Sequence, residues 1–179
     1  MSQGSYAYTN RPSAWRAISA AVVAIVVLVY IAVAIGTEDF LWFLQRTRST
    51  PVEIQVHFDG QTEILTAADP RFEDINDAIR LTVTQVEGYP QRLGLSEQSL
   101  ADYRQVYWSV EALYEEPLVL HSRFRFGEPD HLLIPLSGRH TEQNITFLAQ
   151  NEIFYTGPSL ASTVELQRTL RSYGLAPSE

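Results

Sequence analysis

A run of 19 uncharged residues, Ala17 to Ile35, limits how this chain can fold more than any other feature of its sequence. The run is rich in Ala, Val, Ile and Leu, and as an α-helix it spans about 28 Å, close to the thickness of a bilayer's hydrocarbon core. Lipid offers the backbone no hydrogen-bond partners, so a segment of this kind has to be helical in a membrane. The run therefore predicts a transmembrane helix over residues 17–36, with the lipid bilayer as a partner.

Two other interpretations of the run remain open. A secretory signal peptide has a similar sequence, and residues 34–36 are compatible with a cleavage site, but its apolar core usually spans only about 7–15 residues. A buried helix of a soluble protein is disfavoured by the many valines, because β-branched side chains lose conformational freedom in a helix. The membrane anchor is the preferred interpretation.

Residues around the run predict its position and orientation. Trp15 precedes it and Phe40, Trp42 and Phe43 follow it, and such rings favour the interface between lipid headgroups and tails. Residues 1–16 contain arginine but no acidic residue, which is typical of a cytoplasmic tail. We therefore expect a single-pass protein of the cell membrane with a cytoplasmic N-terminus and an extracytoplasmic C-terminal domain.

The sequence after the run divides into two parts. Residues 37–51 place apolar side chains on neighbouring helical turns and predict a juxtamembrane amphipathic stalk, and residues 52–179 are long enough for one domain. Within that domain, residues 52–58 alternate apolar and polar side chains, Asp59-Gly60 is typical of a tight turn, and residues 63–66 resemble a second strand. This pattern predicts a β-hairpin.

Helix signals follow the hairpin. Asp69 and Pro70 are typical of a helix start, and apolar residues then recur at helical spacing, which predicts a helix from Pro70 to about Glu87. Residues 92–103 are compatible with one short helix. Near the end of the chain, residues 162–165 fit a capping box and Gly174 fits a helix stop, which predicts a final helix.

Five further strands are predicted at residues 106–114, 118–126, 131–136, 145–149 and 153–156. The connections between strands are too short for parallel crossovers. The expected fold class is therefore α+β, with one N-terminal transmembrane helix followed by a small domain in which two helices pack on a mainly antiparallel sheet.

Composition excludes several kinds of chemistry. The chain has no cysteine and all 13 basic residues are arginine, which removes disulfides, thiolate metal sites, cysteine nucleophiles and Schiff-base lysines. The formal net charge is −8, and no acidic residue precedes Glu38. An acidic domain repels backbone phosphates, so we expect no nucleic-acid partner.

Residue spacing gives no sign of an active site. His57, His121, His131 and His140 are not spaced as ligand pairs, and we interpret them as structural or solvated. Ser137 precedes a glycine but lacks the second glycine of a nucleophile elbow, so a turn explains it. We predict no catalytic, cofactor-binding or metal-binding residue.

One charged row is a candidate contact site. The period of two in the predicted strand 118–126 aligns His121, Arg123 and Arg125 on one face, where they are able to meet a partner's carboxylates or an anionic ligand. The alternative is that they pair with the domain's own glutamates on the solvent face.

These features predict a non-catalytic single-pass membrane protein. The expected role is an accessory or assembly subunit of a larger membrane protein complex, such as a respiratory or photosynthetic one, with membrane-protein partner subunits. The alternative is a membrane-anchored extracytoplasmic module that binds or senses a ligand. An enzyme is the least favoured class, because it requires a convergent acid or histidine site that no motif indicates.

Overall fold

The computed structural model describes residues 14–44, 47, 49–88, 94–122, 124 and 126–178 of the chain. The chain divides into two compact units, Met1–Phe40 and Leu41–Glu179. Arg123 and Arg125 of the predicted charged row lie outside the described residues.

The first unit contains helix α1, Ala14–Thr37, which is 24 residues long. Its apolar side chains are exposed almost throughout, including Trp15 and Val26. The helix ends where the Thr37 hydroxyl donates to the Val33 carbonyl and Glu38 adopts a φ of 56°. The predicted helix is confirmed, and it is long and apolar enough to cross a membrane, a property that a signal sequence shares.

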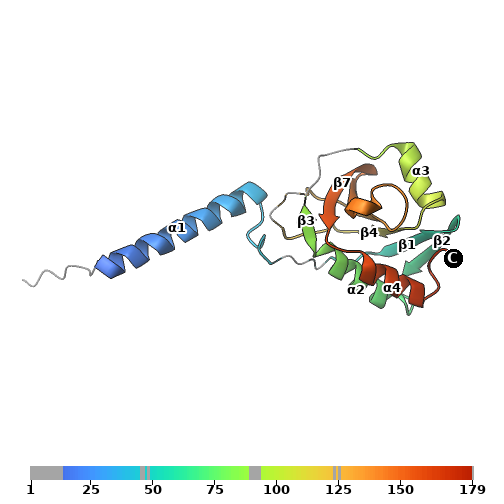
Figure 1. Ribbon diagram of the computed structural model, residues 1–179, viewed down its shortest axis with the longest axis horizontal. Coiled ribbons are helices and arrows are strands. Elements are labelled where there is room, and N and C mark those ends of the chain that lie inside the picture. The colour runs from blue at the N-terminus through green and yellow to red at the C-terminus, as the bar shows by residue number, and fades with distance from the viewer. Residues whose placement is uncertain are drawn as a thin grey trace, which may run out of the picture. The chain divides into compact units, whose positions relative to one another are not determined.

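The second unit contains an antiparallel sheet with strand order β2-β1-β4-β5-β6-β7-β3 in the part of the chain that the structure describes (Figure 1). The strands are β1 Glu53–Phe58, β2 Gln61–Thr66, β3 Val86–Gly88, β4 Ser109–Leu113, β5 His131–Pro135, β6 Ile145–Gln150 and β7 Ile153–Leu160. The helices are α2 Phe72–Val83, α3 Glu97–Gln105 and α4 Val164–Ser172, with a 3-10 turn η1 at Thr141–Gln143. The predicted α+β class is confirmed.

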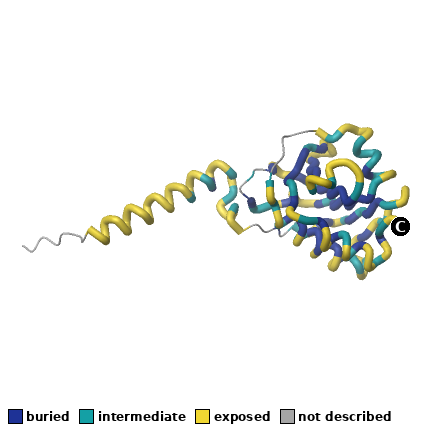
Figure 2. The backbone as a smooth tube through the Cα atoms, viewed as in Figure 1, coloured by how far each residue is buried: buried dark blue, intermediate teal, exposed yellow. Residues whose placement is uncertain are grey.

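The sheet carries a core on each face. The α2 and α4 helices cover one face, which we call the helix-pair face, and the larger cluster there includes Val56, Ile79 and Leu166. The α3 helix lies on the opposite face, the α3 face, over a smaller cluster that includes Tyr103 and Phe147. Figure 1 shows the helices on these two sides, and Figure 2 shows the buried residues concentrated in the strands between them.

The predicted hairpin is confirmed. The β1 and β2 strands pair in antiparallel register from Glu53–Thr66 to Phe58–Gln61. Asp59 and Gly60, which connect them, have φ values of 49° and 72°. Positive φ at both central residues makes this a type I′ turn, whose twist matches that of the strands it joins.

The helix predicted from Pro70 to Glu87 forms but is shorter. It starts at Phe72, after an Asp69 carboxylate that accepts from the Arg71 backbone N–H at 2.8 Å, and it ends at Val83. The prediction of its end is wrong because Val86 continues the apolar period but pairs with Leu160 of β7 instead. A strand partner distant in sequence has overridden the local pattern.

The strand predicted at 118–126 is wrong, since no described residue in this segment has strand structure. The apolar residues of the alternating pattern are nevertheless buried, since Leu118 and Phe126 belong to the helix-pair core. The Ser122 hydroxyl accepts from the Phe124 N–H and donates to the Phe124 carbonyl, both at 2.9 Å. This local turn uses backbone groups that a strand needs for its ladder.

The β7 strand is longer than the predicted strand 153–156, since it continues through Gly157 and Pro158 to Leu160. Thr146 on β6 donates to the Pro158 carbonyl at 2.8 Å, and a Cβ on Gly157 would lie 2.6 Å from the Thr146 hydroxyl. The glycine therefore serves close strand packing rather than a turn.

The predicted final helix is confirmed as α4, but its capping box is not formed. The Ser162 hydroxyl accepts from the Val164 N–H at 3.2 Å instead of from Glu165, and Thr163, the residue at the N-cap, makes no side-chain cap hydrogen bond. At the other end, Gly174 has a φ of 71°, and the N–H groups of Gly174 and Leu175 donate to the carbonyls of Arg171 and Leu170. These two bonds define a Schellman motif, the predicted stop.

Candidate functional site

A buried cluster of charged side chains lies on the α3 face of the sheet. Glu111, in the central part of the sheet on β4, is 1% exposed, and Arg104 of α3 donates to both of its carboxylate oxygens at 2.6 and 3.0 Å. His57 of β1 is 2% exposed, with Nε2 3.5 Å from the Glu111 carboxylate and Nδ1 2.9 Å from the Thr62 hydroxyl. We call these four residues the Glu111 network.

The network keeps its buried acid ionised. Burial by itself would raise the pKa of Glu111, but the contact with His57 and the hydrogen bonds from Arg104 outweigh burial and lower that pKa to about 2. Arg104 is held in turn, since its guanidinium lies 5.9 Å from the centre of the Phe154 ring. The bidentate pair joins α3 to the sheet, which assigns the network a structural role.

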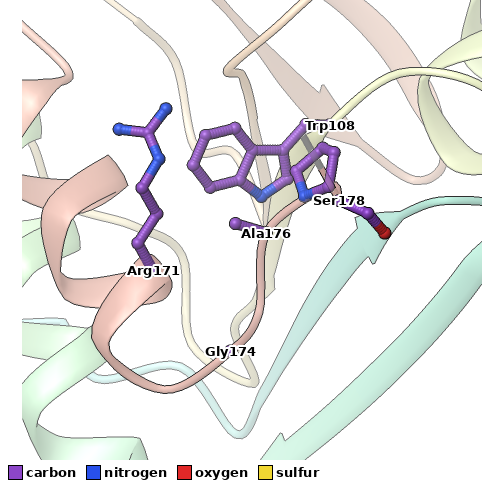
Figure 3. A pocket seen from close by; sticks show the side chains of 6 residues that line it. Trp108, Arg171, Gly174, Ala176 and Ser178 are labelled. Atoms are coloured by element: carbon purple, nitrogen blue, oxygen red, sulfur yellow. The ribbon is translucent and has the colours of Figure 1, made fainter.

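A second site is an open cavity of about 410 Å³ at the end of α4. Trp108, Arg171, Gly174, Ala176, Pro177 and Ser178 line it. Figure 3 shows Arg171 beside the indole of Trp108, with the C-terminal segment running past both. We call this site the Trp108 cavity.

The Trp108 ring is fixed and Arg171 is exposed. The indole N–H donates to the Leu175 carbonyl at 3.0 Å, so the Schellman turn positions the ring. The Arg171 guanidinium lies 5.2 Å from the ring centre and makes no ion pair with any described residue. A cation held over an aromatic face at the rim of a cavity is suited to an anionic group.

The predicted contact row does not form a row in the described residues. His121 is half-buried in the irregular segment after Leu118 rather than on a strand, and Arg123 and Arg125 lie outside the described residues. The period-two argument that aligned the three side chains therefore has no strand to support it.

The four residues predicted for the membrane interface lie at or beyond the two ends of α1 along the chain. Trp15 is in the first turn of the helix, and Phe40, Trp42 and Phe43 follow its last turn. Trp15, Phe40 and Phe43 are exposed, whereas Trp42 is half-buried and packs edge-on against Phe43. Their contact with lipid stays a prediction.

The histidines and Ser137 have structural surroundings. The His131 ring bonds to Asp130 at 2.8 Å, and the His140 ring packs edge-on against Phe147. The Ser137 hydroxyl accepts from the Trp108 backbone N–H at 2.7 Å. Within the described ranges, no three His, Asp or Glu side chains are grouped to hold a metal ion.

Sequence reasoning missed both sites. Glu111 had a signal: it is an acid within an otherwise apolar stretch, Val110 to Leu113, and a charge on a buried strand requires a partner. The partner, Arg104, gave no signal, because the pairing depends on how α3 folds back over β4. The Trp108 cavity had none, since it joins residues more than 60 positions apart.

Comparison with known proteins gives no relative. No protein-family model matches the chain, and neither a curated protein nor a solved structure matches it.

Proposed function

We propose that this chain is a non-catalytic, single-pass membrane protein that serves as an accessory or assembly subunit of a larger membrane protein complex. One observation carries the proposal: α1 exposes an apolar surface over most of its length, with Ile25, Val26 and Leu28 each at least 60% exposed. Water is a poor solvent for such a surface, whereas lipid and the helices of other membrane proteins cover it without cost.

The Glu111 network supports the non-catalytic part of the proposal. Its acid and histidine are almost wholly buried, and the bidentate bond from Arg104 occupies both carboxylate oxygens. A general acid or base needs contact with substrate and a pKa near the working pH, and Glu111 has neither property.

Membrane anchoring is tested by washing membranes at high pH. The full chain should remain in the membrane pellet, and Val26→Arg should reduce the retained fraction, because a charge at the centre of the helix costs about 2.5–3.5 kcal/mol on insertion. Val164→Arg, at a similarly exposed valine of α4, is the matched control and should be retained like wild type. Release of a soluble chain lacking residues 1–36 would instead identify a signal peptide.

The accessory role is tested by purification from the native membrane in a mild detergent. A second protein should co-purify with the chain in a fixed ratio. A chain that elutes with no other protein under conditions that keep known complexes intact would contradict the role.

The Trp108 cavity favours a second function, an anchored module that binds a small anionic ligand. Arg171 supplies a charge that no described acid neutralises, beside an aromatic ring able to stack on a ligand. Aromatic carboxylates such as benzoate are the probe, added to the full chain in detergent while its thermal unfolding is followed. Stabilisation that Arg171→Gln removes and Arg168→Gln keeps would support this function, and no stabilisation would dismiss it.

A further inference from the structure

The outer edge of β2 is open for pairing. The β2 strand ends the strand order and pairs on one side with β1, while no described strand pairs with its other side. The edge is visible at the border of the sheet in Figure 1 and is mostly exposed in Figure 2. Unpaired edges of this length are templates for a further strand.

The hairpin register defines which backbone groups are available. A two-residue type I′ turn closes on a hydrogen-bonded pair, here Phe58 and Gln61, so Gln61, Glu63 and Leu65 direct their backbone groups towards β1. The backbone groups of Thr62 and Ile64, and the N–H of Thr66, consequently point outward. The Thr66 carbonyl already accepts from the Asp69 N–H.

The usual protections of an edge strand are missing from β2. The strand has no proline, no bulge in its pairing with β1 and no lysine. Its side chains on the α3 face are all β-branched, Thr62, Ile64 and Thr66, and Ile64 is 56% exposed. Its one charged residue, Glu63, points to the other face, where Arg71 binds it at 2.8 Å.

We propose that this edge binds the same edge of a second copy of the chain, forming a twofold dimer with a continuous antiparallel sheet. The strand is self-complementary about Ile64. Placing the axis there sets Ile64 opposite Ile64 of the copy and Thr62 opposite Thr66 of the copy. The two Ile64 residues then exchange both backbone hydrogen bonds, and each Thr62 carbonyl accepts from the Thr66 N–H of the copy. The two exposed isoleucines bury each other on the α3 face.

Charge selects this register over its neighbour. Moving the axis by one residue to Glu63 places the two Glu63 carboxylates directly opposite, and like charges in that position are destabilising. With the axis at Ile64, each Glu63 lies opposite Leu65 of the copy and keeps its ion pair with Arg71. Because the chains carry like net charge, −8 each, the dimer should also strengthen when salt is added.

The first test is disulfide cross-linking, which is specific because the chain has no cysteine of its own. Residues opposite each other in a hydrogen-bonded antiparallel pair have Cα atoms about 5.5 Å apart, within the range that a disulfide bridges. Full-length Ile64→Cys in mild detergent should form a disulfide-linked dimer under mild oxidation. Ile153→Cys, at an equally apolar and more exposed position of β7, is the matched control and should link much more slowly. Equal linking of the two variants would overturn the proposal.

The second test measures the dimer directly, by analytical ultracentrifugation of the full chain in detergent. Ile64→Lys places two ammonium groups at the twofold axis and should weaken dimerisation at least about tenfold, which is about 1.4 kcal/mol. Ile153→Lys should dimerise like wild type. Both sites are exposed, so thermal unfolding of the variants should match that of wild type and exclude misfolding. A wild-type monomer at every concentration, or a dimer that Ile64→Lys leaves intact, would overturn the proposal.

Discussion

The Glu111 carboxylate on the α3 face shows what a buried charge requires in this fold. Glu111 is 1% exposed on a strand whose neighbours Val110 and Ala112 belong to the helix-pair core. An unpaired carboxylate there would be strongly destabilising, so the bidentate bond from Arg104 is a condition for the strand to occupy the middle of the sheet. The pair also links α3, a short helix with few apolar residues of its own, to that sheet.

Removing Arg104 should therefore be costly. Arg104→Met keeps an unbranched apolar stem but removes the guanidinium, which leaves Glu111 with His57 as its remaining partner, and we expect a loss of about 2–4 kcal/mol in the free energy of unfolding. Arg168→Met is the control, because its ion pair with Glu165 is exposed on both sides and should contribute less than about 0.5 kcal/mol. Urea unfolding in detergent measures both variants. Similar losses for the two would show that the buried pair contributes no more than a surface pair.

The same carboxylate should make stability depend on pH. The pKa of Glu111 is about 2 in the folded chain against 4.5 for an ordinary glutamate, so its stabilisation is present above pH 4.5 and is lost as the pH falls towards 2. The full effect is about 3 kcal/mol. The Glu111→Gln variant should lose less stability than wild type between pH 5 and pH 2.

Other acids with lowered pKa values, Asp59, Asp69 and Asp130, remain in both proteins. The difference between the two unfolding curves therefore isolates Glu111. Parallel curves for wild type and Glu111→Gln over this range would refute the assignment.

At the scale of elements, sequence patterns predicted what local geometry decides. The hairpin was predictable because Asp59-Gly60 tolerates positive φ at both positions, and α4 because Gly174 supplies the left-handed residue after its end. The patterns were misleading where a distant strand determines the secondary structure. The apolar period of α2 continues to Val86, but Val86 pairs with β7 in the sheet. In the segment from Leu118, alternating burial arises without any ladder, because a Ser122 turn replaces it.

The Schellman end of α4 gives a prediction at this scale. Gly174→Ala should destabilise the folded chain by about 1 kcal/mol, because an L side chain is strained at a φ of 71° although the space around Gly174 is open. Gly94→Ala is the matched control, since Gly94 also has open space but no positive φ, and it should be neutral or slightly stabilising. Equal effects on thermal unfolding would show that backbone conformation is not the cause. Loss of the motif should also loosen Trp108, whose indole donates to the Leu175 carbonyl, and so raise its fluorescence quenching by iodide.

At the scale of the whole molecule, the sequence separated an apolar helix from an α+β domain because hydrophobicity and periodicity differ so sharply between them. It placed the start of the domain at residue 52, since the strand pattern begins there. The contacts extend the compact unit back to Leu41. Thr47 and Pro51 are buried, and the Ser49 hydroxyl accepts from the Val119 N–H at 3.0 Å. The helical spacing that predicted an amphipathic stalk over residues 37–51 does not reveal this attachment, because single side chains rather than a repeating face make it.

Two fragments without α1 test where the independent unit begins. A fragment of residues 41–179 should be soluble and unfold cooperatively, because both hydrophobic clusters lie after residue 53 and are complete without α1. A fragment of residues 52–179 should also fold, but with about 1–3 kcal/mol less stability, because it lacks two buried residues and the Ser49 bond to the segment before Leu120. The Ser49→Ala substitution in the longer fragment should reproduce about 1 kcal/mol of this difference, since the Val119 N–H then loses its partner. Denaturant unfolding of the two fragments and the Ser49→Ala variant measures the differences. Equal unfolding midpoints would show that residues 41–51 are a simple linker.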